Sequence, residues 1–193
     1  MKVDTPPFGY YDKNGTLTGF DIDLAKLITK KTLGDENKAI FVPVNTSNRI
    51  MKLASQEVDM IIATMSVTPQ REMILDFSIP YHTAGQAILV RNSSNITTLS
   101  ELNNKKIALV FGSTVEKNLR TIIPNAIILG YKTYTEAFNA LKEGKAEYWK
   151  NFTSCALYYL SLSSTKPITI FRKFVEQDLI DLFDLINYLV SSS

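Results

Sequence analysis

The stretch Ala63-Thr64-Met65-Ser66-Val67-Thr68-Pro69-Gln70-Arg71 contains the transition that decides the fold. It ends a nearly continuous apolar run over residues 58–65, which is typical of a strand covered on both faces. Thr68 and Pro69 then suit the cap and the first turn of a helix. A buried strand that passes directly into a helix is the repeating unit of an α/β fold, so this stretch predicts that class.

The same design recurs at Val110-Phe111-Gly112-Ser113-Thr114-Val115-Glu116, where Ser113 and Glu116 have capping-box spacing. Outward from the two junctions, strand-like and helix-like patterns alternate. The further strands are predicted at residues 38–44, 84–91, 105–111, 126–131 and 166–174. The further helices are predicted from Gly19 onward and at 47–56, 134–142 and 175–190, the first with an apolar face of Phe20, Leu24, Leu27 and Ile28.

Composition excludes several classes of function. The 193 residues are 45% hydrophobic and carry a formal net charge of +2, which gives no electrostatic reason to expect nucleic acid or an anionic membrane as partner. One cysteine, Cys155, and one histidine, His82, cannot form a disulfide framework or a cysteine or histidine metal cluster. We therefore expect no metal and no cofactor. No run reaches the ~18 apolar residues of a membrane span.

The two junctions suit an anionic ligand. The first turn of a helix offers free N–H groups and partial positive charge. Arg71 adds a planar guanidinium group that can donate two parallel hydrogen bonds to a carboxylate. Ligands of open α/β sheets lie outside the carboxyl ends of the strands. Helix capping alone would also explain both junctions, and Arg71 could instead pair with Glu72 or Asp76. From spacing alone, the binding and the structural interpretation stay open.

Further motifs occur in a characteristic order along residues 1–146. They are Pro6-Pro7-Phe8-Gly9-Tyr10, Gly19-Phe20-Asp21-Ile22-Asp23-Leu24-Ala25, Asn48-Arg49-Ile50, Val58-Asp59-Met60-Ile61, Thr68-Pro69-Gln70-Arg71, Asp76-Phe77-Ser78-Ile79-Pro80-Tyr81, Leu102-Asn103-Asn104-Lys105-Lys106 and Gly112-Ser113-Thr114. Together they resemble the type II amino-acid-binding proteins of ABC importers, solute-binding protein family 3, of the glutamate/glutamine type.

This resemblance implies an α/β fold of two lobes, each a mostly parallel sheet flanked by helices. We expect residues 1–86 in lobe 1, residues 87–170 in lobe 2, and residues 171–193 returning to lobe 1. It also implies an amino-acid ligand in the cleft. Arg71 would hold the α-carboxylate with Ser66 and the Ser113-Thr114 turn, and the backbone of Thr64 would meet the α-ammonium.

The remaining site residues follow from the same resemblance. Phe8 would form the aromatic wall, while Lys2 and Arg49 would meet a side-chain carboxylate, because a second buried anion needs a second cation. The chain departs from the pattern after residue 146, so we expect the second lobe to be atypical or incomplete beyond that residue. The aspartate that pairs with the ligand ammonium is replaced by Phe152, beside Asn151. We expect either Asn151 or Glu147 to substitute for it, or amino-acid binding to be weak.

The expected function is that of a monomeric receptor that delivers glutamate, aspartate or glutamine to the membrane permease of an ABC importer. Its expected location is the periplasm or the cell surface with a lipid anchor, and the targeting segment is expected to lie outside these 193 residues, since residues 1–9 are not a signal peptide. Two alternatives are a sensor or degenerate module of the same fold that binds amino acids weakly or not at all, and an enzyme similar to cyclohexadienyl dehydratase. The enzyme is the less favoured because only Glu147 could act as a general acid.

Overall fold

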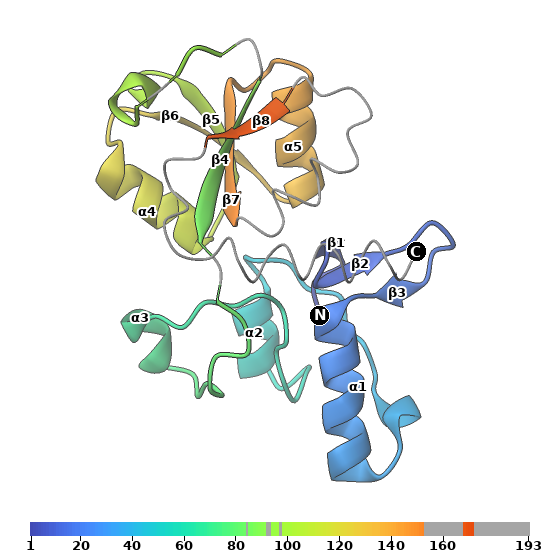
Figure 1. Cartoon of the computed structure of the whole chain (residues 1–193). Coiled ribbons are helices and arrows are strands. Elements are labelled where there is room, and N and C mark those ends of the chain that lie inside the picture. The colour runs from blue at the N-terminus through green and yellow to red at the C-terminus, as the bar shows by residue number, and fades with distance from the viewer. Residues whose placement is uncertain (84, 92–93, 97, 153–167, 172–193) are drawn as a thin grey trace.

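A computed structural model describes residues 1–83, 85–91, 94–96, 98–152 and 168–171. Helices and strands alternate along these residues, and they form two groups joined by the chain that enters β4 (Figure 1). The α/β class and the two-lobed arrangement are thus confirmed. The predicted helix at 175–190 and Cys155 lie outside the described residues.

The first lobe runs from β1 to α3. Strands β1 (Asp4–Thr5), β2 (Gly9–Tyr11) and β3 (Leu17–Thr18) form an antiparallel sheet, followed by α1 (Phe20–Leu33), η1 (Glu36–Lys38), α2 (Arg49–Ala54) and α3 (Pro69–Glu72). The helix predicted at Thr68-Pro69 forms as expected, with Thr68 accepting a hydrogen bond from the backbone N–H of Arg71.

The second lobe is built on a five-stranded sheet with the order β6-β5-β7-β4-β8. Its elements are β4 (Gln86–Arg91), η2 (Ser100–Leu102), β5 (Lys106–Val110), α4 (Thr114–Ile122), β6 (Ile127–Tyr131), α5 (Tyr134–Lys142), β7 (Tyr148–Phe152) and β8 (Ile168–Phe171). Trp149 packs against Phe138 of α5 on one face, and Leu119 of α4 lies in the core cluster of the other face. Local patterning predicted β4, β5, β6, β8, α4 and α5, because both faces of the sheet are buried, but it did not predict β7 or η2.

The second lobe keeps a regular sheet beyond residue 146, where we expected it to become atypical or incomplete. Strand β7 lies inside the sheet, parallel to β5 and antiparallel to β4, and β4 is also antiparallel to β8. The sheet is therefore regular as far as Phe152, and the expectation of an atypical or incomplete lobe stays a prediction for residues 153–167, which lie outside the described part.

Two strands predicted in the first lobe are wrong. Residues 39–45 form no strand, although Val44 donates its N–H to the carbonyl of Met1 at 2.9 Å and the amino group of Met1 donates to Val42 at 2.7 Å. In the 58–65 run, a side chain takes the place of a neighbouring strand as hydrogen-bond partner of the backbone: Arg49 donates to the Ala63 carbonyl at 2.7 Å. A strand needs a partner backbone over several residues, which the described part of this lobe does not supply.

The first lobe also differs from the expected mostly parallel sheet, because its three described strands are short and antiparallel. Consequently, the apolar face predicted for α1 is not covered by a sheet. Phe20 and Leu27 are exposed, Leu24 and Ile28 line a cavity, and the residues of this helix that are buried are Asp21 and Ile22. The apolar pattern of α1 is real, but its packing partner is absent from the described residues.

Candidate functional site

The carboxyl ends of three strands meet at one edge of the second sheet. Val110 of β5 lies opposite Tyr131 of β6, and β7 runs parallel to β5, so Phe152 ends at the same edge. Helices α4 and α5 begin immediately after β5 and β6. This edge thus carries two helix N-termini, the arrangement that open α/β sheets use to bind ligands.

The Gly112-Ser113-Thr114 turn is held by a tight set of local hydrogen bonds. The Ser113 hydroxyl donates to the carbonyl of Val110 at 2.7 Å and accepts from the N–H of Glu116 at 3.4 Å. The Glu116 carboxylate accepts from the N–H of Gly112 at 3.2 Å, so the described bonds differ from a simple Ser113–Glu116 capping box. Thr114 is the first residue of α4 and is half-buried.

The first lobe touches this edge directly. The backbone N–H of Tyr134, at the start of α5, donates to Asp4 at 3.2 Å, and the ammonium of Lys2 lies 3.8 Å from the centre of the Tyr134 ring. A Cβ built on Gly112 would lie 3.8 Å from the side chain of Thr46. The edge of the second sheet therefore faces the first lobe and contacts it, so the expected cleft would lie between these two surfaces.

Two guanidinium groups of the first lobe belong to this cleft region. Arg49 is buried and donates to the Ala63 carbonyl, while Arg71 is half-buried and donates to the Ser66 carbonyl at 2.7 Å. Burial and the nearby charge of Arg71 lower the pKa of Arg49 to about 10, and burial also lowers the pKa of Arg71. The charge of Arg71 thus acts on Arg49, and both guanidinium groups are at least partly removed from water.

No carboxylate among the described residues forms an ion pair with either arginine. The alternative that Arg71 pairs with Glu72 or Asp76 is therefore wrong. In addition, Nε of Arg49 is buried and has no hydrogen-bond partner in the described part of the chain. A buried cation with an unused donor is costly unless an anion joins it, so Arg49 is suited to a carboxylate ligand.

Tyr134 is a candidate site residue that the sequence reading missed. Its side chain is buried and interacts electrostatically with both Arg49 and Arg71. A usable signal was present, because Thr133 and Glu136 form a complete capping box at the start of α5. That spacing marks a third strand-to-helix junction of the same design as the first two.

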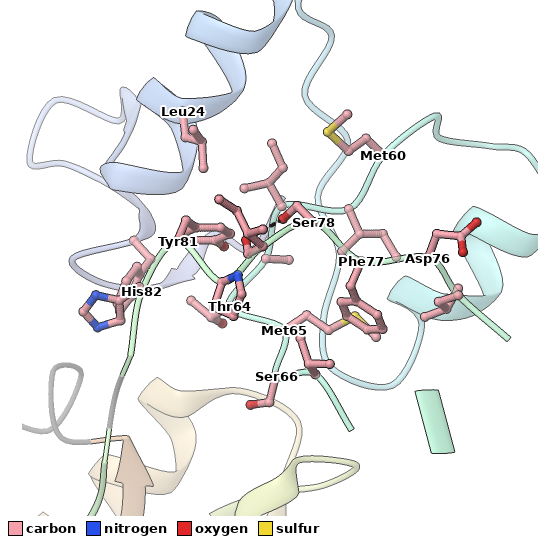
Figure 2. A pocket seen from close by; sticks show the side chains of 18 of the residues that line it. Leu24, Met60, Thr64, Met65, Ser66, Asp76, Phe77, Ser78, Tyr81 and His82 are labelled. Carbon is pink, nitrogen blue, oxygen red and sulfur yellow. Dashed lines mark hydrogen bonds between the residues drawn. The ribbon is translucent and has the colours of Figure 1, made fainter. Parts of the chain in front are cut away.

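The predicted site residues do not form one group. Phe8, Thr64 and Ser66 line a cavity of ≈ 680 Å³ inside the first lobe, whereas Lys2, Arg49, Arg71, Ser113 and Thr114 do not line it. Figure 2 shows Thr64, Ser66 and Tyr81 around this cavity, with Leu24 and Met60 at its margin. This first-lobe cavity and the two arginines Arg49 and Arg71 are therefore separate features.

Thr64 has a constrained backbone, with φ of 47°. Its N–H donates to the buried carboxylate of Asp21 at 3.2 Å, and the Tyr81 hydroxyl donates to the other oxygen of Asp21 at 3.1 Å. Burial raises the pKa of Asp21. Phe8 packs its ring edge-on to His82, at 5.0 Å between ring centres. Thr64 and Phe8 thus take part in internal contacts of the first lobe.

Glu147 does not fit the ammonium role considered for it. Its carboxylate lies 3.5 Å from Nζ of Lys105 and accepts from the N–H of Lys106 at 3.3 Å. It precedes β7, at the end of that strand far from the cleft edge, so this alternative is wrong. Asn151 lies opposite Ala87 near the cleft end of β7, but its side chain lies outside the described part.

Comparison with known proteins identifies the family. The family model for bacterial extracellular solute-binding proteins, family 3, matches residues 1–188. The chain belongs to this family. Solute-binding proteins of family 3 act outside the cytoplasm by the family's description, which supports a periplasmic or cell-surface location.

Several family members are similar in sequence or structure. An ABC transporter glutamine-binding protein of Bacillus subtilis (strain 168) is 42% identical over 149 residues, which is 76% of this chain and 55% of that protein. A glutamine-binding protein of Geobacillus stearothermophilus is 40% identical over 149 residues, again 76% of this chain and 57% of that protein. The chain thus matches little more than half the length of these relatives.

The structural comparison supports the same fold. An ancestral arginine-binding protein bound to glutamine superposes with a TM-score of 0.83 at 34% identity, covering 99% of this chain and 88% of that one. The described residues contain no group of three or more histidine, cysteine, aspartate or glutamate side chains placed to hold a metal ion. Among the described helices, none has the length and hydropathy of a membrane span.

Proposed function

We propose that this family 3 protein is a receptor that binds a polar or acidic amino acid in the cleft between its lobes. The observation that carries the proposal is that Arg49, which is buried, and Arg71, which is half-buried, have no carboxylate partner among the described residues. The α-carboxylate of the ligand would pair with Arg71 near the Ser113-Thr114 turn. The relatives named for glutamine make glutamine the first candidate, with glutamate and aspartate next.

The cleft contacts support binding by closure. Residues of the two lobes already meet at Tyr134 and Asp4, and Lys117 of α4 donates to Gln70 of α3 at 3.4 Å. A ligand that touches both lobes adds contacts only when they approach, so it favours the closed arrangement. Delivery to the permease of an ABC importer is the role that we propose for the closed form, with the protein acting as a monomer.

Titration calorimetry with glutamine, glutamate, aspartate and arginine tests this function. We expect binding of glutamine or an acidic amino acid, and we expect Arg71→Ala to weaken it at least a hundredfold, because leaving a buried charge unpaired costs about 3–5 kcal/mol. Arg120→Ala is the matched control, since Arg120 is an exposed arginine paired with Glu116. Tight arginine binding without a glutamine or glutamate response would contradict the proposal, and no binding at all would favour a degenerate module.

The part of the site that would hold the ligand ammonium lacks an acidic side chain at position 152. Phe152 ends β7 at the cleft edge, where the family pattern has an aspartate, and a phenyl ring cannot pair with an ammonium ion. We therefore propose that Asn151 provides at most a neutral partner and that affinity is reduced. Phe152→Asp should tighten binding about a hundredfold or more. An unchanged affinity would show that residue 152 does not face the ligand.

A further inference from the structure

Lys2 is a buried lysine of the first lobe that contacts the second lobe. The residue is only 2% exposed, so little of its charge is stabilised by water. A buried ammonium group is costly unless other groups of the protein or a ligand stabilise it. The neighbours of Lys2 therefore decide whether its charge is available to an amino acid in the cleft.

Tyr134 of the second lobe is the first of these neighbours. Nζ of Lys2 lies 3.8 Å from the centre of the Tyr134 ring, which is within the range of a cation–π contact. Tyr134 is itself 3% exposed and belongs to the core cluster that contains Phe138 and Trp149. Its backbone N–H donates to Asp4 at 3.2 Å, only two residues along the chain from Lys2. The ring is thus held in place against the ammonium group from both lobes.

Asp21 is the second neighbour that acts on Lys2. Burial raises the pKa of Asp21, and the positive charge of Lys2 is among the influences that oppose this rise. The charge of Lys2 therefore interacts with an aromatic face and with a carboxyl group of the protein itself. A carboxylate of a ligand would have to compete with both.

The two arginines differ from Lys2 in this respect. Neither Arg49 nor Arg71 pairs with a carboxylate among the described residues, and Nε of Arg49 has no hydrogen-bond partner there. If Arg71 holds the α-carboxylate, the side chain of the ligand has Arg49, and not Lys2, as its cationic partner. Glutamate brings a second carboxylate, whereas glutamine brings a neutral amide. The engagement of Lys2 therefore disfavours glutamate more than glutamine.

We propose that Tyr134 is a positioning residue that sets specificity: it holds the Lys2 ammonium against its ring, and the site therefore selects glutamine over glutamate. The proposal rests on the proposed function, because it names the ligand of the same cleft. Lys2 then supports the site without touching the ligand, which differs from the role that the family resemblance implies for it.

Displacement of radiolabelled glutamine by glutamine and by glutamate measures this selectivity in the full chain. We expect Tyr134→Leu, which removes the ring face, to shift the ratio of the two affinities about fivefold or more toward glutamate. Tyr134→Phe keeps the ring and is the matched control, with a ratio within about twofold of the wild type. Equal weakening of both amino acids in Tyr134→Leu would indicate a structural role alone and would overturn the proposal.

Lys2→Met tests the other partner of the contact. We expect this variant to change the ratio by less than about twofold, and we expect its combination with Tyr134→Leu to abolish the shift that Tyr134→Leu gives alone. A selective loss of glutamate affinity in Lys2→Met would show that Lys2 meets the ligand, and the proposal would be wrong. A wild type that binds neither amino acid would refute the proposed function and this specificity with it. Binding by the wild type with an unchanged ratio in Tyr134→Leu would refute the specificity alone.

Acetylation by acetic anhydride, followed by peptide mass spectrometry, tests the contact without a ligand. We expect Lys2 to react severalfold more slowly than the exposed Lys13 in the wild type and in Tyr134→Phe. In Tyr134→Leu we expect Lys2 to react severalfold faster than in the wild type, with Lys13 unchanged. Equal rates for Lys2 and Lys13 in the wild type would overturn the proposal, whether or not Tyr134→Leu folds.

Discussion

The hydroxyl of Tyr81 donates a hydrogen bond to the buried carboxylate of Asp21 at 3.1 Å. This contact joins the first turn of α1 to the segment that leads into β4. The second oxygen of Asp21 accepts from the backbone N–H of Thr64 at 3.2 Å. One side chain thus holds together three parts of the first lobe that are far apart in sequence.

We expect Asp21→Ala to destabilise the protein by about 1–3 kcal/mol, because two partly buried donors lose a buried acceptor. Urea unfolding followed by circular dichroism measures the loss. Asp23→Ala is the control, since Asp23 is exposed in the same turn of α1. Similar losses for both variants would mean that Asp21 acts only through its charge at the helix terminus.

The pH dependence of the Asp21 effect has a definite sign. Burial raises the pKa of Asp21 above the ordinary value of about 4, so the folded state binds this proton more tightly than the unfolded state does. The advantage of the wild type over Asp21→Ala should be largest below about pH 4. It should shrink as the pH rises through the raised pKa. If the difference in free energy of unfolding between the wild type and Asp21→Ala instead grew as the pH rose above about 4, a raised pKa of Asp21 would be contradicted.

Lys150 is a buried lysine in β7, and burial lowers its pKa to about 8. Its buried charge costs stability below pH 8, and that cost disappears as the pH rises from 8 toward the ordinary lysine pKa of about 10.4. We expect Lys150→Met to stabilise the protein by about 1–3 kcal/mol at pH 6.5 and by much less at pH 9.5. Urea unfolding at both pH values is the measurement. The exposed Lys106 supplies the control variant Lys106→Met, which removes no buried charge and should therefore give no comparable stabilisation at pH 6.5.

Arg49 offers a way to separate ligand recognition from stability. Replacing a buried charge by an apolar side chain of similar size is often neutral, so Arg49→Met should stay within about 1 kcal/mol of the wild type without ligand. In contrast, we expect its affinity for glutamate to fall at least tenfold and its affinity for glutamine to fall less, as measured by calorimetry. Equal losses for the two amino acids would argue against a contact with the side-chain carboxylate.

Gly112 has a φ of 70° and faces Thr46 of the other lobe. Gly112→Leu should therefore cost about 1 kcal/mol through backbone strain and should also weaken ligand binding by obstructing cleft closure. Gly15→Leu is the matched control, because Gly15 has a φ of 78° and open space around it. Comparable stability losses with an affinity loss only for Gly112→Leu are expected. Unchanged affinity in both would place Gly112 outside the closing surface.

The sequence by itself determined the elements whose signals are local. Thr68-Pro69 and Ser113 predicted helix starts, and the doubly buried strands and helix of the second lobe followed from their apolar runs, because each element there has a partner on both faces. The ordered motifs likewise predicted the family. Spacing alone left the role of Arg71 open, since a cation beside a helix start suits both an anion site and a surface ion pair, and the resemblance supplied its predicted role in the site.

Only the tertiary structure decided what depends on partners distant in sequence. The 38–44 and 58–65 segments carry strand-like sequences, but a strand forms only where another backbone lies alongside. Burial of Asp21 depends on Thr64 and Tyr81, and the position of Tyr134 beside Arg49 and Arg71 depends on how the lobes meet. The separation of the first-lobe cavity from Arg49 and Arg71 is likewise a property of packing, because sequence order placed Thr64, Ser66 and Arg71 side by side.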